Sequence, residues 1–170
     1  MTPGEILYAK HDELCCLKLV GDIRYTVGSL YMVSRSLDLL LDRLFDSGGF
    51  NDILIDMSET VCIDSTNLGL LARIAVHTKE TFDRSPTIIC DNPDVLRIME
   101  SMGCQRVFVI VKEGSDVEPE LVPLEGVEAS DRDRIRLLLK AHRALVGLSE
   151  ENRAQFSDIV ELLEKDLEVN

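Results

Sequence analysis

The residues most able to take part in chemistry lie in one segment, DMSETVCIDSTNLGLLARI, which spans positions 56–74. A short apolar strand pattern leads into this segment and a helical pattern follows it, so the polar residues between them stand at a helix start. Four consecutive polar residues occupy that place: Asp64, Ser65, Thr66 and Asn67. All four are favoured helix N-cap residues, so capping alone accounts for them. Gly69 is costly in an early helical turn unless something packs closely on it, so we expect this end of the helix to meet another surface.

Signals for an enzyme are weak elsewhere in the chain. The sequence contains no GxxxxGK[ST] phosphate loop, no GxGxxG motif and no GxSxG motif. The three histidines, His11, His77 and His142, are scattered, make no metal-ligand pattern with the cysteines and give no histidine-based catalytic motif. We therefore expect a protein that is not an enzyme, with no catalytic residue, no metal and no cofactor.

The cysteines and the charge indicate the surroundings of the protein. The sequence has five cysteines, which is an odd number: Cys15, Cys16, Cys62, Cys90 and Cys104. No two of them have CxxC spacing. Most stand in apolar strand-like runs, which is typical of core residues in a reducing cytoplasm; a redox or metal role is the alternative. The net charge of -13 disfavours binding to nucleic acid or anionic lipid. No apolar run approaches the roughly 20 residues of a membrane span, and no signal peptide is recognisable. We expect a cytoplasmic protein.

The elements that position the 56–74 segment alternate between strand and helix patterns. Two strands at about 5–12 and 13–20 are typical of a hairpin, and later strands are expected at about 52–57, 87–90 and 106–111. Helices are expected between them, at about 30–45 before Gly48–Gly49, from about 64 onwards, and from Asn92–Pro93 to about 102. The order ββαβαβαβ predicts an α/β fold with a mixed, mainly parallel sheet covered by helices.

The C-terminal third differs from the rest of the chain. Residues 112–130 hold two prolines, two glycines and six acids and are expected to form an acidic linker or a segment that wraps the domain. Two leucine-rich amphipathic helices follow, separated near Gly147, and Ser149 is a plausible N-cap of the second. We therefore divide the chain into a domain at 1–111, a linker at 112–130 and a helical hairpin extension at 131–170. The hairpin could pack on its own chain, form a homodimer or bind a partner, and it could regulate by covering the Ser65 face.

The chain resembles a known family. The order ββαβαβαβ, Gly21–Asp22 after the second strand and the pattern Asp-Ser-Thr-x-Leu-Gly-Leu at 64–70 are similar to the STAS domain, and within it to bacterial anti-sigma factor antagonists. The resemblance covers about residues 5–111. It implies that Ser65, directly after the motif aspartate, is phosphorylated by the partner anti-sigma factor, which is a serine kinase. It also implies that a PP2C-type phosphatase removes the phosphate, and that the unphosphorylated form binds the anti-sigma factor and frees the sigma factor.

The same resemblance suggests the residues of the partner face. These are Asp22, Arg24, Asp64, Thr66, Asn67, Leu68 and Gly69. Family members often have glycine in place of Asn67; asparagine tolerates the unusual backbone angles of glycine, so we expect the loop to keep its shape.

A phosphate at Ser65 suits a binding switch. A phosphoserine adds about -1.5 to -2 charges, and a helix N-terminus tolerates that charge, so the fold should survive. Beside Asp64, Asp56 and Glu59 the phosphate would deepen a negative patch and penalise a partner surface that desolvates a neutral hydroxyl. Two other functions stay open. One is a scaffolding or ligand-sensing STAS protein that acts through assembly, and the other is a small α/β enzyme.

Overall fold

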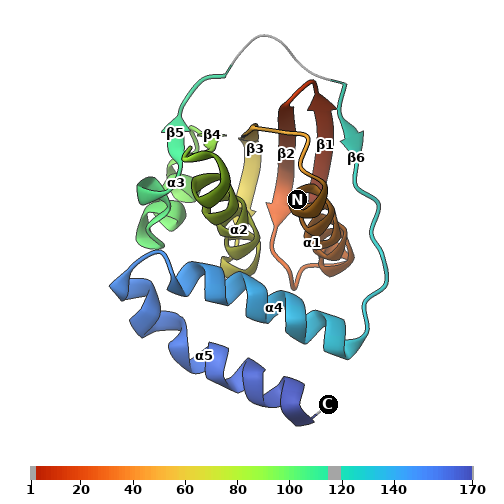
Figure 1. The fold of residues 1–170 in the computed structure, drawn as a ribbon, viewed down its shortest axis with the longest axis vertical. Coiled ribbons are helices and arrows are strands. Elements are labelled where there is room, and N and C mark those ends of the chain that lie inside the picture. Colours follow the sequence, from red (N-terminus) through yellow and green to blue (C-terminus); the bar gives the residue numbers. More distant parts are fainter. Residues whose placement is uncertain (1–2, 115–119, 170) are drawn as a thin grey trace.

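The protein is built on a six-stranded sheet with the strand order β5-β4-β3-β2-β1-β6 (Figure 1). The computed structural model describes residues 3–114 and 120–169. Strands β1 (Glu5–His11) and β2 (Leu14–Ile23) form an antiparallel hairpin. Strands β2, β3 (Asp52–Ile63), β4 (Thr87–Ile89) and β5 (Val109–Val111) are parallel neighbours. The predicted mainly parallel α/β sheet is confirmed.

Three helices connect the parallel strands. Helix α1 (Leu30–Ser47) joins β2 to β3, α2 (Ser65–Phe82) joins β3 to β4, and α3 (Pro93–Ser101) leads towards β5. Figure 1 shows α1 and α2 side by side over one face of the sheet. Alternate residues of the central strands are buried, as expected where helices cover a sheet face: Cys15, Leu17, Leu19, Ile53, Ile55 and Met57. This arrangement brings the start of α2 to the edge where the parallel strands end.

Several predicted boundaries were wrong. Strand β3 continues past Met57 to Ile63, because a register shift after Lys18 places Ser58 and Glu59 outside without ending the pairing with β2. Gly21–Asp22 does not follow β2 but lies within its last residues, where Gly21 has a positive φ of 83° beside a second register shift. Residues 104–106 form the short 3-10 helix η1 (Cys104–Arg106), so the last strand begins later than predicted.

The segment predicted as an acidic linker wraps the domain where it is described. Strand β6 (Val122–Pro123) pairs with β1, and the Leu124 N–H donates to the Ile6 carbonyl at 2.8 Å. The Val127 N–H donates to the Met32 carbonyl at 3.2 Å, so the segment also follows α1. Residues 115–119 of the predicted linker lie outside the described residues.

The tail forms two helices, as its periodicity predicts. Helix α4 (Asp131–Val146) begins with a capping box at Ser130, and α5 (Glu150–Val169) follows after a short turn. In Figure 1, α4 crosses the lower ends of α1 and α2, and α5 lies along its outer side. Leu137, Ala141 and Leu145 of α4 join the same hydrophobic core as the sheet. The division at residues 111 and 130 therefore remains a prediction, as does a dimer through these helices.

Candidate functional site

Asp64 ties two segments of the chain together at the start of α2. Its Oδ1 accepts the Asn67 backbone N–H at 3.0 Å, which is the N-cap bond of the helix. Its Oδ2 accepts the Tyr25 backbone N–H at 2.6 Å, from the loop after β2. A carboxylate with two such bonds holds the helix start against the end of the neighbouring strand. The predicted cap is therefore confirmed, with Asp64 as the capping residue.

Asn67 is a buried polar link with 1% of its surface exposed. Its Oδ1 accepts the Ser34 hydroxyl of α1 at 2.8 Å, and its Nδ2 donates to Asp64 Oδ1 at 3.1 Å and to the Ile23 carbonyl at 3.3 Å. Among the described non-glycine residues only Asp12 and Asp83 have positive φ, so Asn67 does not substitute for glycine through unusual backbone angles. The reason given for the expectation, tolerance of unusual backbone angles, therefore does not apply; the amide instead joins α1, α2 and β2.

Ser65 is the first residue of α2 and is half-buried. Its Oγ lies 3.2 Å from Nε2 of His142, a residue of α4 that is 4% exposed. The other ring nitrogen, Nδ1, lies 2.7 Å from the Leu138 carbonyl, which can only accept, so Nδ1 carries the proton. The second ring nitrogen, Nε2, therefore faces the Ser65 hydroxyl as its hydrogen-bond partner.

The Ser65–His142 pair is the contact that the sequence analysis missed. The two residues are 77 positions apart in the sequence, and a contact over such a separation cannot be predicted from the spacing of a motif. One signal was present: His142 stands between Leu138 and Leu145 at helical spacing, on the side of the tail helix that was expected to be buried.

Gly69 is where α4 crosses α2. A Cβ added at Gly69 would overlap the carbonyl group of Ala141 and lie 2.7 Å from its Cβ. The helices can approach this closely only because position 69 has no side chain. The expectation that this end of α2 meets another surface is confirmed, and that surface belongs to the same chain.

Asp22 and Arg24 form a paired-charge clamp next to Asp64. The guanidinium donates from Nε at 2.7 Å and from Nη2 at 2.6 Å to the two Asp22 oxygens. Asp22 is buried, and its hydrogen bonds from Arg24 hold the pKa of the carboxyl below its usual range against the opposite effect of desolvation. The side chain of Arg24 remains 42% exposed. The loop is fixed beside the α2 start by the Tyr25–Asp64 hydrogen bond.

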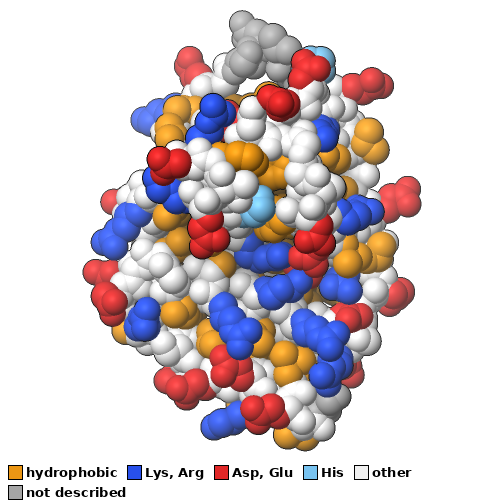
Figure 2. All heavy atoms as spheres, in the orientation of Figure 1, with side chains coloured by type: hydrophobic (Ala, Val, Ile, Leu, Met, Phe, Trp, Pro, Cys, Tyr) orange, Lys and Arg blue, Asp and Glu red, His pale blue; other side chains and the backbone are white. Residues whose placement is uncertain are grey.

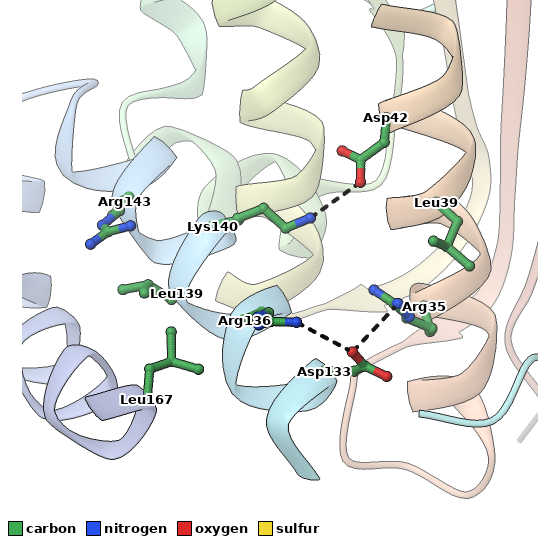
Figure 3. A pocket seen from close by; sticks show the side chains of 9 residues that line it. All are labelled: Arg35, Leu39, Asp42, Asp133, Arg136, Leu139, Lys140, Arg143 and Leu167. Carbon is green, nitrogen blue, oxygen red and sulfur yellow. Dashed lines mark hydrogen bonds and ion pairs between the residues drawn. The ribbon is translucent and has the colours of Figure 1, made fainter. Parts of the chain in front are cut away.

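A buried carboxylate links α4 to both domain helices. Asp38 of α1 has no exposed side-chain surface and lies 2.6 Å from Arg73 of α2, 2.9 Å from Lys140 of α4 and 3.2 Å from Arg35. A hollow of about 360 Å³ adjoins this carboxylate between α1 and the tail. Figure 3 shows Lys140 reaching Asp42 there, and Arg35 and Arg136 converging on Asp133. Each of these four cations already has a carboxylate partner. Figure 2 shows that basic side chains gather over this part of an otherwise acidic protein.

The predicted partner-face residues thus lie together, but at different depths. Asp64 and Ser65 are half-buried, and the side chain of Arg24 is partly exposed. The other members are buried: Asp22, Thr66, Asn67, Leu68 and Gly69. Only Asp64 of the three predicted acidic neighbours adjoins Ser65; Asp56 and Glu59 lie back along β3, where Glu59 pairs with Lys18 at 2.6 Å. The predicted negative patch around Ser65 is correspondingly smaller.

The described residues form neither a metal cluster nor a membrane-spanning helix. No three or more of their His, Cys, Asp and Glu side chains come together as metal ligands. Within the same part of the chain, no helix is both long and apolar enough to cross a membrane.

Comparison with solved structures supports the fold. The unphosphorylated form of the anti-sigma factor antagonist SpoIIAA aligns with a TM-score of 0.50 and 13% identity, over 65% of this chain and 89% of that one. The phosphorylated Bacillus cell fate determinant SpoIIAA aligns with a TM-score of 0.46 and 14% identity, over 64% and 92% of the two chains. No protein-family model and no curated protein sequence matches the chain. The predicted STAS-like fold is confirmed by the SpoIIAA likeness at a TM-score of 0.50.

Proposed function

We propose that this chain is a phosphorylation-switched regulatory protein of the bacterial cytoplasm. With Ser65 unphosphorylated it binds an anti-sigma factor that is also a serine kinase, and so releases a sigma factor or a similar target. The kinase phosphorylates Ser65 and ends the interaction, and a PP2C-type phosphatase restores it. The chain itself catalyses no step.

The observation that carries this proposal is the division of roles within residues 64–67. Asp64 and Asn67 hold the α2 start to the rest of the fold through hydrogen bonds. The side chain of Ser65 instead contacts His142 of the tail helix, so modifying it leaves those links in place. A phosphate there adjoins the N-terminal N–H groups of α2, which favour an anion. A switch needs such a residue, whose charge can change while the fold persists.

The proposal is tested by mapping and by binding. Wild type, Ser65→Ala and Ser65→Asp are used as baits in native cytoplasm, and the captured kinase is then incubated with wild type and ATP. Phosphopeptide mapping should place the phosphate on Ser65, and phosphate mainly on the neighbouring Thr66 would refute the assignment. In calorimetry with the purified kinase, Ser65→Asp should bind about tenfold or more weakly than Ser65→Ala, since tenfold is only about 1.4 kcal/mol. Equal affinities would show that charge at Ser65 does not control binding.

A second candidate function has one specific observation in its favour. The Ser65–His142 hydrogen bond at 3.2 Å is the geometry of a nucleophile and its general base. The orienting group on His142 is a backbone carbonyl instead of a carboxylate, and α4 contacts the serine through His142. A fluorophosphonate probe tests this candidate: labelling of Ser65 in the native protein would support a hydrolase.

A further inference from the structure

The surface of α2 from Ser65 to Gly69 is occupied by the chain's own tail. His142 hydrogen-bonds to the Ser65 hydroxyl, and one turn further along α2 the Ala141 backbone lies against Gly69. His142 is itself covered by Phe156 of α5, whose ring lies 5.6 Å away in an edge-on arrangement. Figure 1 shows the hairpin across the edge where the parallel strands end, which is where open α/β sheets usually bind their ligands.

We propose that this α2 surface is an interaction surface that the α4–α5 hairpin fills in cis, so that a kinase or partner protein reaches Ser65 only when α4 leaves α2. The identity of the protein that binds this surface rests on the proposed function. The movement of the α4–α5 hairpin away from α2 does not. A serine kinase must place the hydroxyl in its own active site, and here that hydroxyl is held beneath an imidazole. The apparent affinity of any protein that binds this surface is therefore its intrinsic affinity multiplied by the fraction of molecules in which the hairpin is open.

Two further contacts hold the hairpin closed. At the α1 side, Lys140 lies 2.9 Å from the buried Asp38 carboxylate. At the α3 side, the Asn152 amide donates to the Met102 carbonyl at 2.8 Å and to the Leu145 carbonyl at 2.9 Å. These contacts are separate from the Gly69 crossing, so each can be weakened by itself. Weakening one should shift the closed population without unfolding the sheet.

A phosphate on Ser65 is incompatible with the closed contact as it stands. In the closed contact the Ser65 Oγ lies 3.2 Å from Nε2 of the buried His142, and α4 packs on α2 one turn further on. A separation of 3.2 Å between Oγ and Nε2 leaves no room between these atoms for a phosphoryl group. The phosphate would also meet the adjacent Asp64 carboxylate and a closely packed helix contact at Gly69. Phosphorylation should therefore open the hairpin. The partner still does not bind the opened surface, because the charge of the phosphate opposes the desolvation that binding requires.

Hydrogen–deuterium exchange on the full-length protein tests this without any partner. Two forms should open the hairpin: protein with phosphoserine installed biosynthetically at position 65, and Gly69→Ala, which overlaps the Ala141 backbone. Exchange of the α4 and α5 amides should rise about tenfold or more in both, since overpacking of one methyl against a backbone is costly. The β2 and β3 amides should be unchanged, because they report global unfolding.

A matched substitution controls for the change from glycine to alanine. A Cβ at Gly147, in the turn of the same hairpin, would have its nearest neighbour 3.6 Å away, so Gly147→Ala should exchange like wild type. Lys140→Met weakens the hairpin at the Asp38 contact and leaves that carboxylate with Arg35 and Arg73, so it serves if Gly69→Ala fails to fold.

The outcomes separate the hairpin from the proposed function. Unchanged α4 exchange in the phosphoserine form, or increased protection there, would overturn the inference even if Ser65 proves to be the kinase target. Unchanged exchange in the folded Gly69→Ala and Lys140→Met forms would also overturn it, because the hairpin would then not depend on these contacts. Faster α4 exchange in these forms would support the proposal that the hairpin covers α2. If phosphate were mapped to a residue other than Ser65 at the same time, the proposed phosphorylation switch would be refuted.

Discussion

Replacing Asp38 with asparagine should destabilise the protein more than any surface charge change. The amide would keep the shape of the side chain and remove its charge from a place with no exposed surface. Three cations would lose that partner: Arg73 at 2.6 Å, Lys140 at 2.9 Å and Arg35 at 3.2 Å. The change therefore tests whether this carboxylate is the electrostatic link between α1, α2 and the tail.

The size of the effect follows from burial and from the remaining partners. Removing one partner of a buried ion pair typically costs about 3–5 kcal/mol. The cations here are 15–34% exposed, and Arg73 and Lys140 keep Asp42 at 2.7 and 3.5 Å, so the expected loss is smaller. We expect about 2–3 kcal/mol, which corresponds to a fall in Tm of roughly 4–12 °C for a chain of this size.

The assay is urea unfolding of full-length wild type, Asp38→Asn and a control, Asp83→Asn. Asp83 pairs with Lys79 at 2.8 Å, but both side chains are largely exposed, and its left-handed φ of 53° suits asparagine. The control should stay within about 0.5 kcal/mol of wild type. If Asp38→Asn matched this control with an unchanged m-value, the buried carboxylate would not be a stabilising link and the reasoning would be wrong.

Three further predictions use other parts of the fold. Asn67→Ala should lower the free energy of unfolding by about 2–4 kcal/mol in the same assay, because it leaves the buried Ser34 hydroxyl and Ile23 carbonyl without this partner. Asp22→Asn should be less stable than wild type by an amount that is constant above about pH 5 and shrinks below about pH 4, measured by unfolding at several pH values. The sign follows because the lowered pKa of Asp22 gives stability that is lost as pH falls through the folded value. Iodoacetamide should alkylate Cys62 first in the native protein, as read by peptide mass spectrometry, because the other four thiols are buried.

Much of the fold could be predicted because local signals agreed with the final arrangement. The order of strands and helices followed from periodicity, and the cap residues marked helix starts correctly: Asn92 caps α3, and the Ser149 hydroxyl accepts the Asn152 N–H at 3.1 Å. The end of β3 was misplaced because a bulge beside Lys18 interrupts the alternation that sequence patterns rely on. Local pattern is reliable only where the backbone is regular.

The candidate site could be located from the sequence but not assembled. Residues 64–67 could be recognised as a helix start. All four residue types are favoured at the N-cap, however, so their separate roles could not be assigned from the sequence. Those roles depend on partners that are distant in sequence, such as Ser34 for Asn67 and His142 for Ser65. A polar residue's task is set by what packs against it, which is a property of the tertiary structure.

The unfavourable helix propensity of Gly69 indicates a tertiary contact. Glycine within a helix is about 1 kcal/mol less favourable than alanine, so α2 alone would gain from Gly69→Ala. The full chain keeps the glycine at the place where the Ala141 backbone touches α2, one turn from Ser65. The close crossing therefore offsets the propensity cost, and it holds the tail where it covers the serine. Because Ala141 is itself fully buried, the crossing that buries α4 also brings His142 to Ser65, which the fold leaves half-buried while it buries the neighbouring Thr66.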